Sequence, residues 1–287
     1  MHNDPMSCIT PSPRLVTEWV ESIDSTNAEI FRRTPLVDGD ADALWLVARR
    51  QTAGRGRLAR RWVSTPDASL TASLGLEAPL PRQPASLSLA VGATIAAVLA
   101  GFGAECRVKW PNDLYRRSDA GDWCKVGGIL CELRSGASRA RIAIGVGLNL
   151  APGALAGLDA PAGGAVGASV AAGAAAVRGG CLFASPQAVP DRLLLAGALG
   201  AALHRAARRF LADGLGPFLD DWRSLDCLAG QPIVVHRIDG EGVAGIAKSI
   251  DDDGALLVEA AGAPGRLQRV VSDEVSIRLR NDVTLAR

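Results

Sequence analysis

The hydrophobic positions in the first half of the chain form short runs that predict buried strands. These runs are Leu44–Ala48, Ser69–Leu76, Arg107–Trp110, Val126–Leu133 and Ile142–Leu150. Proline has no backbone N–H to give to a sheet, so Pro111 is expected to end the third run. The polar stretch Arg116–Cys124 predicts a turn, and the two runs after it resemble a pair of neighbouring strands.

Helices are predicted in three places. Leu87–Ala100 is apolar and rich in small residues, which indicates a buried helix. Across Pro190–Asp213 apolar positions recur at helical spacing. The opposite side of that helix carries Arg192, Arg205, Arg208 and Arg209. Thr26 followed by Glu29 is a capping-box pattern, so a further helix is expected to begin there.

The pattern changes twice along the second half. Residues Ala151–Gly180 are dominated by Gly and Ala with almost no charge, which predicts a flexible insertion or long loop. Beyond Cys227 come short β runs, with Asp239-Gly240 and Asp253-Gly254 as expected hairpin turns. The runs are Ile233–Arg237, Val243–Ile250, Ala255–Glu259, Leu267–Val271 and Val275–Leu279. Their spacing predicts a small barrel of about sixty residues.

Composition narrows the classes of protein. A chain of 287 residues with 48% hydrophobic and 21% charged residues can bury a sizeable core, which excludes wholesale disorder. The formal net charge of +1 gives no global reason to expect nucleic-acid or membrane binding. The stretches Leu87–Ala100 and Val166–Val177 are too short, or too rich in Gly and Ala, to span a bilayer. The N-terminus lacks the basic start and apolar run of a signal peptide.

The cysteines and histidines predict neither a zinc site nor a disulfide framework. No two of the six cysteines are separated by two residues, and the chain has three histidines. Reduced thiols in a cytosolic protein are therefore expected.

Local charge is concentrated between Arg49 and Trp62, where there are six arginines and no acid. Gly54 and Gly56 allow the backbone to approach a ligand closely, and guanidinium groups offer bidentate contacts to phosphate or carboxylate. The segment predicts either a clamp over a nucleotide and an acid substrate, or an exposed RNA-binding patch. Trp62 is its one aromatic residue, which argues against a stacking series for RNA.

Three further motifs carry candidate chemistry. In Lys109–Asp113, Asn112 and Asp113 are suited to a Mg²⁺ ion or to polar ligand groups, although Asn-Asp after Pro is also an ordinary turn. Lys125 precedes two glycines and an apolar run, so its ammonium group could reach into a site or lie in a hairpin turn. Asn149 ends a predicted strand and could bind a ligand or close a turn.

Taken in order, these motifs closely resemble biotin protein ligase, the family also called biotin–[acetyl-CoA-carboxylase] ligase. The motifs are Ser25–Asn27, Gln51–Arg57, Arg60 with Trp62, Lys109–Asp113, Lys125–Leu130 and Gly145–Asn149. The resemblance extends through Trp222–Asp226, Gly245–Glu259 and Asp273–Arg278, so it covers most of the chain.

The resemblance implies an α+β fold, with a mixed-sheet catalytic domain over residues 1–226 and an SH3-like β-barrel over 227–287. The Gly/Ala-rich insertion, near residues 151–185, belongs to the first domain. The family forms biotinyl-5′-AMP from biotin and Mg²⁺-ATP, then transfers the biotinyl group to a lysine of the biotin carboxyl carrier protein of acetyl-CoA carboxylase. A cytoplasmic monomer or weak homodimer is expected, without membrane binding.

The resemblance also assigns residues to roles. Biotin would be surrounded by Ser25, Thr26, Asn27, Gln51, Gly54, Arg55, Lys125, Gly127, Gly128 and Gly145. The nucleotide and adenylate would be held by Arg57, Arg60, Trp62, Asn112, Asp113 and Asn149. Lys125, Arg57 and Arg60 would be catalytic, and Asn112 and Asp113 would face the metal.

Two features depart from the family pattern. Only 24 residues precede Ser25, so the winged-helix domain of bifunctional members does not fit and no DNA binding is expected. Ala151–Gly180 differs from the usual adenylate-binding segment. Two alternatives stay open: a lipoate–protein ligase of the same fold, and a nucleic-acid-binding regulatory protein that uses Arg49–Arg61.

Overall fold

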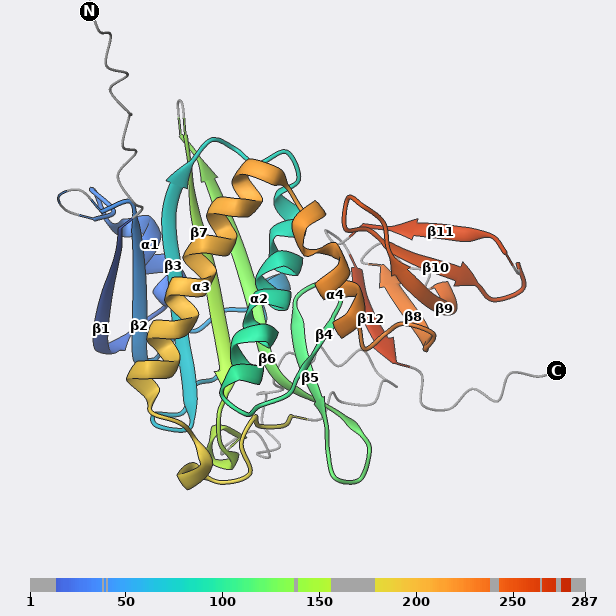
Figure 1. Cartoon of the computed structure of the whole chain (residues 1–287), viewed down its shortest axis with the longest axis horizontal. Helices are drawn as coiled ribbons and strands as arrows, with labels where there is room; N and C mark the ends of the chain where they lie inside the picture. Colours follow the sequence, from blue (N-terminus) through green and yellow to red (C-terminus); the bar gives the residue numbers. More distant parts are fainter. Residues whose placement is uncertain are drawn as a thin grey trace, which may run out of the picture.

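The computed structural model describes residues 14–37, 39, 41–136, 139–155, 179–237, 243–263, 265–271 and 275–279. Within these residues the chain forms a large sheet with helices on both faces and a second, smaller sheet beside it (Figure 1).

The large sheet has seven strands in the order β1-β2-β3-β7-β6-β5-β4. The strands are β1 (Leu15–Ile23), β2 (Ala43–Gln51), β3 (Ser69–Ala78), β4 (Arg107–Lys109), β5 (Asp113–Arg117), β6 (Trp123–Ser135) and β7 (Ala140–Asn149). The pair β1–β2 is parallel and the others are antiparallel, so the predicted mixed sheet is confirmed. The predicted turn at Arg116–Cys124 is shorter than expected, because β5 continues to Arg117 and β6 begins at Trp123.

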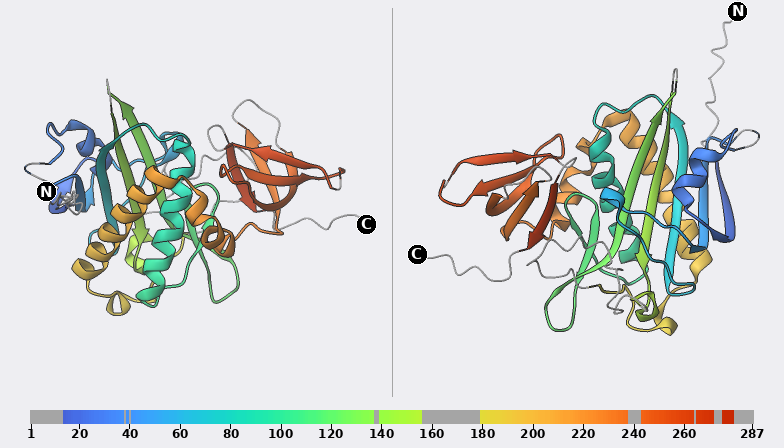
Figure 2. Two further views of the ribbon diagram at one scale, coloured as in Figure 1. Left: turned by 45° about the horizontal axis from the view of Figure 1, so that its top comes forward. Right: turned by 180° about the vertical axis from the view of Figure 1, so that it is seen from behind.

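The helices lie on opposite faces of this sheet (Figure 2). They are α1 (Thr26–Arg32), α2 (Leu87–Gly101), α3 (Arg192–Asp213) and α4 (Leu219–Leu225). Short 3₁₀ turns are η1 (Arg57–Ala59), η2 (Pro84–Ser86), η3 (Pro152–Leu155), η4 (Pro186–Ala188) and η5 (Gly216–Phe218). Alternate residues of β2 divide the core: Trp45 and Val47 belong to the cluster with α2 and α3, whereas Leu44 and Leu46 pack with Ile30 of α1.

Local signals explain where the main helices begin and end. The Ser25 hydroxyl accepts a hydrogen bond from the Ala28 N–H at 3.4 Å, so the cap of α1 is Ser25, one residue earlier than the capping-box prediction. The Asp191 carboxylate accepts from two N–H groups of the first turn of α3 at 2.8 and 2.9 Å. At Gly214, where α3 ends, φ is +71°, a value that glycine adopts readily.

The predicted helix over Leu87–Ala100 is α2, which packs against α3, α4 and β6. Residues 84–101 are long and apolar enough to cross a membrane, but 61% of that stretch is buried inside the protein. Its apolarity is therefore explained by its place in the core.

The smaller sheet has the order β11-β10-β9-β8-β12, and all of its pairs are antiparallel. Its strands are β8 (Pro232–Arg237), β9 (Val243–Ile250), β10 (Leu256–Ala260), β11 (Leu267–Val270) and β12 (Val275–Leu279), which confirms the predicted β runs. Asp253-Gly254 lies in the β9–β10 turn, with φ of +86° at Gly254. The predicted Asp239-Gly240 turn, and residues 156–178 of the Gly/Ala-rich segment, lie outside the described residues.

The β9–β10 turn of the smaller sheet contacts the part of the chain that follows β4 of the larger sheet. The indole N–H of Trp110 donates to the Gly254 carbonyl at 2.9 Å, and a methyl group added at Gly254 would lie 2.7 Å from Leu89. Trp110 is 1% exposed, which confirms its predicted role in the core. The β9–β10 turn thus packs against the segment Lys109–Asp113 through Trp110 and helps to hold that segment in place.

Candidate active site

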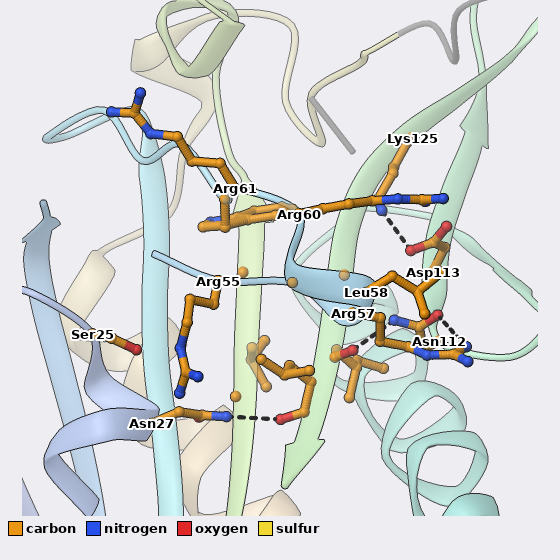
Figure 3. A pocket seen from close by; sticks show the side chains of 18 of the residues that line it. Ser25, Asn27, Arg55, Arg57, Leu58, Arg60, Arg61, Asn112, Asp113 and Lys125 are labelled. Carbon is orange, nitrogen blue, oxygen red and sulfur yellow. Dashed lines mark hydrogen bonds and ion pairs between the residues drawn. The ribbon is translucent and has the colours of Figure 1, made fainter. Parts of the chain in front are cut away.

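A cavity opens on the face of the large sheet that carries α1 (Figure 3). Its walls come from the start of α1, the end of β2, the segment after β2 and strands β5, β6 and β7. The predicted site residues that line it are Ser25, Thr26, Asn27, Gln51, Arg55, Arg57, Arg60, Trp62, Asn112, Asp113, Lys125, Gly128 and Gly145. Motifs as distant as Ser25 and Gly145 therefore meet in one place.

One end of the cavity, which we call the neutral end, is built on the start of α1. The Gln51 side-chain oxygen accepts from the N–H and the hydroxyl of Thr26, at 2.7 and 3.0 Å. Asn27 donates to the Leu130 carbonyl at 3.1 Å and to Glu132 at 2.8 Å. The Ser73 hydroxyl lies 2.6 Å from both Thr26 Oγ1 and Asn27 Oδ1. Thr26 and Asn27 are each 3% exposed, so a buried polar network fixes their orientation.

The floor of the cavity is glycine, which leaves room for groups above it. Gly128 of β6 pairs with Gly147 of β7, and Gly145 lies two residues away on the same face. A methyl group at Gly145 would lie 2.6 Å from Asn27 Oδ1, and one at Gly147 would lie 2.3 Å from the Trp62 ring. Any larger residue would displace these side chains.

The segment Gly54–Trp62 folds back on itself over the cavity. The Trp62 N–H donates to the Gly54 carbonyl at 2.9 Å, and the Gly56 N–H donates to the Arg60 carbonyl at 2.7 Å. A methyl group at Gly54 would lie 2.5 Å from the Trp62 carbonyl oxygen, so this close approach needs glycine. Leu58 has φ of +54°, which is uncommon for a residue with a side chain.

The arginines of this region meet acids from other parts of the chain. Arg49 pairs with Glu21 at 2.7 Å and with Asp67 at 2.8 Å, and Arg55 pairs with Glu132 at 3.2 Å. Two of the six arginines of residues 49–62 are therefore paired with acids from elsewhere in the chain. These pairs also engage part of the patch that the nucleic-acid alternative requires.

The other end, which we call the charged end, centres on Asp113. Its carboxylate lies 2.5 Å from Lys125 Nζ, and Arg57 donates to Asn112 beside it at 3.4 Å. Burial alone would raise the pKa of Asp113, but the charges of Lys125, Lys109 and Arg57 lower it below its ordinary value. Asp113 is therefore an anion held among cations.

Two donors at the cavity lack a partner among the described residues. They are Nε of Arg60 and Nε1 of Trp62, both buried. Buried donors without acceptors are unfavourable, by about 1–3 kcal/mol each. Figure 3 shows the Arg60 side chain reaching toward Lys125. An anionic ligand with several oxygen acceptors would satisfy these groups, so the cavity fits a phosphate-bearing molecule at this end.

The same end offers little to a metal ion by itself. Within the described residues no cluster of three or more His, Cys, Asp or Glu side chains forms a metal site. Asp113 already contacts Lys125, and the side-chain oxygen of Asn112 accepts from Arg57. Since Mg²⁺ is commonly bound through one or two carboxylates and substrate phosphates, these two oxygens suit a magnesium ion that arrives with a nucleotide.

Three predicted site residues do not line the cavity. Gly54 lies at the point where the segment Gly54–Trp62 folds back on itself, and it allows the close approach to the Trp62 carbonyl. A methyl group at Gly127 would lie 2.8 Å from Leu148 and 3.1 Å from Leu114, so this glycine serves packing on the other side of the sheet. Asn149 donates to the Gly180 carbonyl at 3.0 Å and holds that segment against β7, while the Gly180 N–H donates to the Lys125 carbonyl.

Sequence reasoning also missed residues that shape the cavity. Lys109 and Tyr115 line the charged end, and Ser73 and Glu132 fix the neutral end. A signal existed for Ser73: Ser69, Thr71 and Ser73 place a hydroxyl at every second position of an apolar strand, and all three are buried. Hydroxyls on one buried face indicate a polar network.

Comparison with known proteins assigns the family. The model of the biotin/lipoate A/B protein ligase family matches residues 19–149. The bifunctional ligase/repressor BirA of Escherichia coli is 35% identical over 263 residues, which cover 89% of this chain and 72% of that protein. The biotin–[acetyl-CoA-carboxylase] ligase of Paracoccus denitrificans is 32% identical over 251 residues, with 85% and 93% covered. The chain therefore belongs to the biotin/lipoate A/B protein ligase family.

Solved structures agree on the fold. The biotin protein ligase of Aquifex aeolicus in complex with biotin and ATP superposes with a TM-score of 0.67 at 20% identity, covering 92% of this chain and 99% of that one. The Helicobacter pylori biotin acetyl coenzyme A carboxylase synthetase, with bound biotinylated ATP, has a TM-score of 0.52 at 20% identity, with 88% and 98% covered.

Proposed function

We propose that this chain is an ATP-dependent biotin protein ligase of the acetyl-CoA-carboxylase type. The observation that carries the proposal is the joining of two unlike sites in one cavity. The neutral end offers fixed amide and hydroxyl groups around Thr26, Asn27 and Gln51, while the charged end gathers Arg57, Arg60, Lys109 and Lys125. A neutral polar ring with a carboxylate tail would place the ring at the first and the tail at the second.

The proposed reaction has two steps. A biotin carboxylate oxygen attacks the α-phosphorus of ATP, the bond to the β-phosphate oxygen breaks, and pyrophosphate leaves. The carboxylate and the α-phosphate repel each other, and the Lys125 ammonium stabilises the charge that develops between them. In the second step the amine of a carrier lysine attacks the acyl carbon and AMP leaves.

Arg57 and Arg60 would hold phosphate oxygens, since guanidinium groups bind them bidentately. The Trp62 ring, which lies against the glycine floor at Gly147, would form a wall beside the adenylate. Asn112 and Asp113 would reach a Mg²⁺ ion brought by the nucleotide, which screens the phosphate charge when bound. Asn149 is proposed to act indirectly, by holding residues 179–180 beside Lys125.

Biotin fits the neutral end better than lipoate does. A ureido ring can add hydrogen bonds to the second lone pairs and remaining N–H groups of the amides and hydroxyls at this end, whereas an apolar dithiolane ring can form none with them. Since the family includes both kinds of ligase, the experiment must compare the two acids directly.

The proposal also covers the C-terminal domain, the acceptor protein and the oligomeric state. Residues 227–287 are proposed to be an SH3-like barrel, supported by the antiparallel order of β8–β12. The acceptor is proposed to be a biotin carboxyl carrier domain, and the protein a cytoplasmic monomer or weak homodimer. DNA binding is not proposed, because Arg49 and Arg55 are engaged by acids.

The test is intact-mass analysis of a carrier domain after incubation with the protein, Mg²⁺-ATP and either biotin or lipoate. We expect a biotin-sized increment with biotin and none with lipoate. A carrier whose acceptor lysine is replaced by arginine is the matched control and should stay unmodified. Lipoyl transfer without biotinyl transfer would contradict the proposal, and so would a salt-sensitive gel shift with DNA in place of any acyl transfer.

A further inference from the structure

One carboxylate lies between the neutral end of the cavity and the segment Gly54–Trp62. An oxygen of Glu132, on β6, accepts a hydrogen bond from the Asn27 side-chain amide at 2.8 Å and lies 3.3 Å from an Arg55 nitrogen. The other oxygen of Glu132 lies 3.2 Å from the same nitrogen. Figure 3 shows the Arg55 side chain pointing toward Asn27. Glu132 therefore contacts the neutral end and the segment at once.

The contact with Asn27 is part of a buried network. The two hydrogens of the Asn27 amide go to the Leu130 carbonyl, at 3.1 Å, and to Glu132. Its oxygen lies 2.6 Å from the Ser73 hydroxyl. Because both hydrogens are used, the amide cannot turn over without losing these bonds. Glu132 thus helps to decide how Asn27 presents its oxygen to the cavity.

The contact with Arg55 is weaker by itself. The side chains of Arg55 and Glu132 are 45% and 29% exposed, and ion pairs at such positions contribute little stability alone. Backbone contacts continue from Arg55 toward the charged end. Arg55 forms a β-bridge with Arg61, and the Gly56 N–H donates to the Arg60 carbonyl. The place of Arg55 therefore affects the place of Arg60, which lines the cavity.

We propose, resting on the function proposed above, that Glu132 is a positioning residue that transmits occupancy of the neutral end to the segment Gly54–Trp62. A ligand that holds Asn27 also holds the carboxylate that Asn27 shares with Arg55. A group already ordered by one partner loses less entropy when a second partner orders it further. Biotin at the neutral end then makes the segment harder to open, and this link requires the charge of Glu132.

A direct contact between biotin and the segment would protect the segment without Glu132. The variant Glu132→Gln separates the two mechanisms. Its side-chain oxygen can still accept from Asn27, whereas its amide nitrogen cannot accept from Arg55. Glu21→Gln is the matched control, since it removes a carboxylate that lies 2.7 Å from Arg49 and does not line the cavity.

The first test is limited trypsin digestion of the full chain, since trypsin cleaves after arginine. Mass analysis counts the cuts after three residues of the segment, Arg57, Arg60 and Arg61. Each protein is digested without biotin and with biotin at a concentration that calorimetry shows to be saturating. Biotin should slow these cuts at least about fivefold in the wild-type protein and in Glu21→Gln, but less than about twofold in Glu132→Gln.

Equal protection of the wild-type protein and Glu132→Gln would overturn the proposal, and so would biotin binding that leaves the wild-type segment unprotected. If calorimetry shows no biotin binding to the wild-type protein, the proposed function itself has failed. The digestion without biotin still tests the ion pair in that case. Glu132→Gln should then be cut about two to five times faster than the wild-type protein.

The second test is a double-mutant cycle with Arg55→Met. If Glu132 acts through Arg55, adding Glu132→Gln to Arg55→Met should not change the protection by biotin any further. Independent, additive losses would overturn the proposal. Glu132→Ala completes the set, because it removes the acceptor of Asn27 as well. It should weaken biotin binding at least about threefold more than Glu132→Gln does, and equal weakening would contradict the shared role of the carboxylate.

Discussion

The neutral and charged ends of the cavity differ in where their polar groups find hydrogen-bond and charge partners. At the neutral end, the side chains of Thr26 and Asn27 find their partners within the protein, in Gln51, Ser73 and Glu132. At the charged end, several cations surround the carboxylate of Asp113, and Arg60 and Trp62 keep buried donors without an acceptor among the described residues. The first end is complete without ligand, whereas the second needs negative charge from outside.

This difference separates recognition from chemistry. A hydrogen-bonded network that is already formed loses little entropy when a ligand binds, so it favours shape and group recognition. Fixed cations are strongest where charge develops during reaction. Changes at the neutral end should therefore alter the biotin concentration that the enzyme needs, while changes at the charged end should alter the rate of adenylate formation.

The largest effect is expected for Lys125→Ala. Loss of a positioned cation at the reacting groups should reduce adenylate formation by about 10²–10³-fold. Pyrophosphate release in single turnovers measures this rate, and thermal unfolding checks the fold. Near-normal release with unchanged thermal stability would remove Lys125 from the mechanism and end the distinction between the two ends.

Gly145→Ala probes the neutral end. Its new methyl group would lie 2.6 Å from Asn27 Oδ1, which Ser73 and Glu132 hold in place. We expect overpacking of about 1–3 kcal/mol, seen as an increase of about 5–150-fold in the KM for biotin with the KM for ATP unchanged. Steady-state kinetics with each substrate varied gives both values. An equal rise in both KM values would show that the two ends are not separable.

Ser73→Ala tests the network beneath the neutral end. It removes a hydroxyl that lies 2.6 Å from both Thr26 Oγ1 and Asn27 Oδ1 and whose one hydrogen is donated to one of these two oxygens. The expected loss is about 1–3 kcal/mol of unfolding free energy, with a smaller change in the KM for biotin. Denaturant unfolding provides the measurement, and Ser73→Thr is the control that keeps the hydroxyl. A variant as stable as the wild-type protein would contradict the network.

The smallest effect on the reaction is expected at Asp226, behind the charged end, where a substitution should change stability alone. Burial raises the pKa of Asp226 to about 6, although the Leu228 N–H and the charge of Lys109 act against this. A carboxyl with a raised pKa in the folded state destabilises the protein as pH rises through that value, and the penalty disappears below the ordinary pKa. One pKa unit corresponds to about 1.4 kcal/mol, so Asp226→Asn should gain up to about 3 kcal/mol of unfolding free energy above pH 6 and almost nothing near pH 3. Denaturant unfolding of the variant and the wild-type protein at both pH values measures this difference. A gain in unfolding free energy that is the same at both pH values would contradict the prediction.

Much of the fold could be predicted because burial leaves a direct pattern. The apolar runs located β2, β3, β6 and β7, and the motifs located Lys125, Arg57 and Asn112 in one cavity. Strand β1 was not predicted, because it lies at the edge of the sheet, where exposed and half-buried positions alternate without a clear apolar run.

Long-range pairing could not be predicted from one chain. The acid that meets Arg55 is 77 residues away, and one that meets Arg49 is 18 away. Nothing in the local sequence of residues 49–62 shows that these partners exist. Glu132 was missed for the same reason: its importance depends on the register of β6 against β7 and on the place of α1 above them.

The hydrogen bond from Trp110 to Gly254 has a consequence for biosynthesis. It joins residues 144 positions apart, whereas the residues of the neutral end lie between Ser25 and Gly147. Protein domains generally fold as they emerge from the ribosome, at about 5–20 residues per second. We therefore expect a growing chain to complete its biotin pocket first and to gain support behind Lys109–Asp113 only when β9 and β10 have been made. An unfinished enzyme would hold biotin before it could activate it.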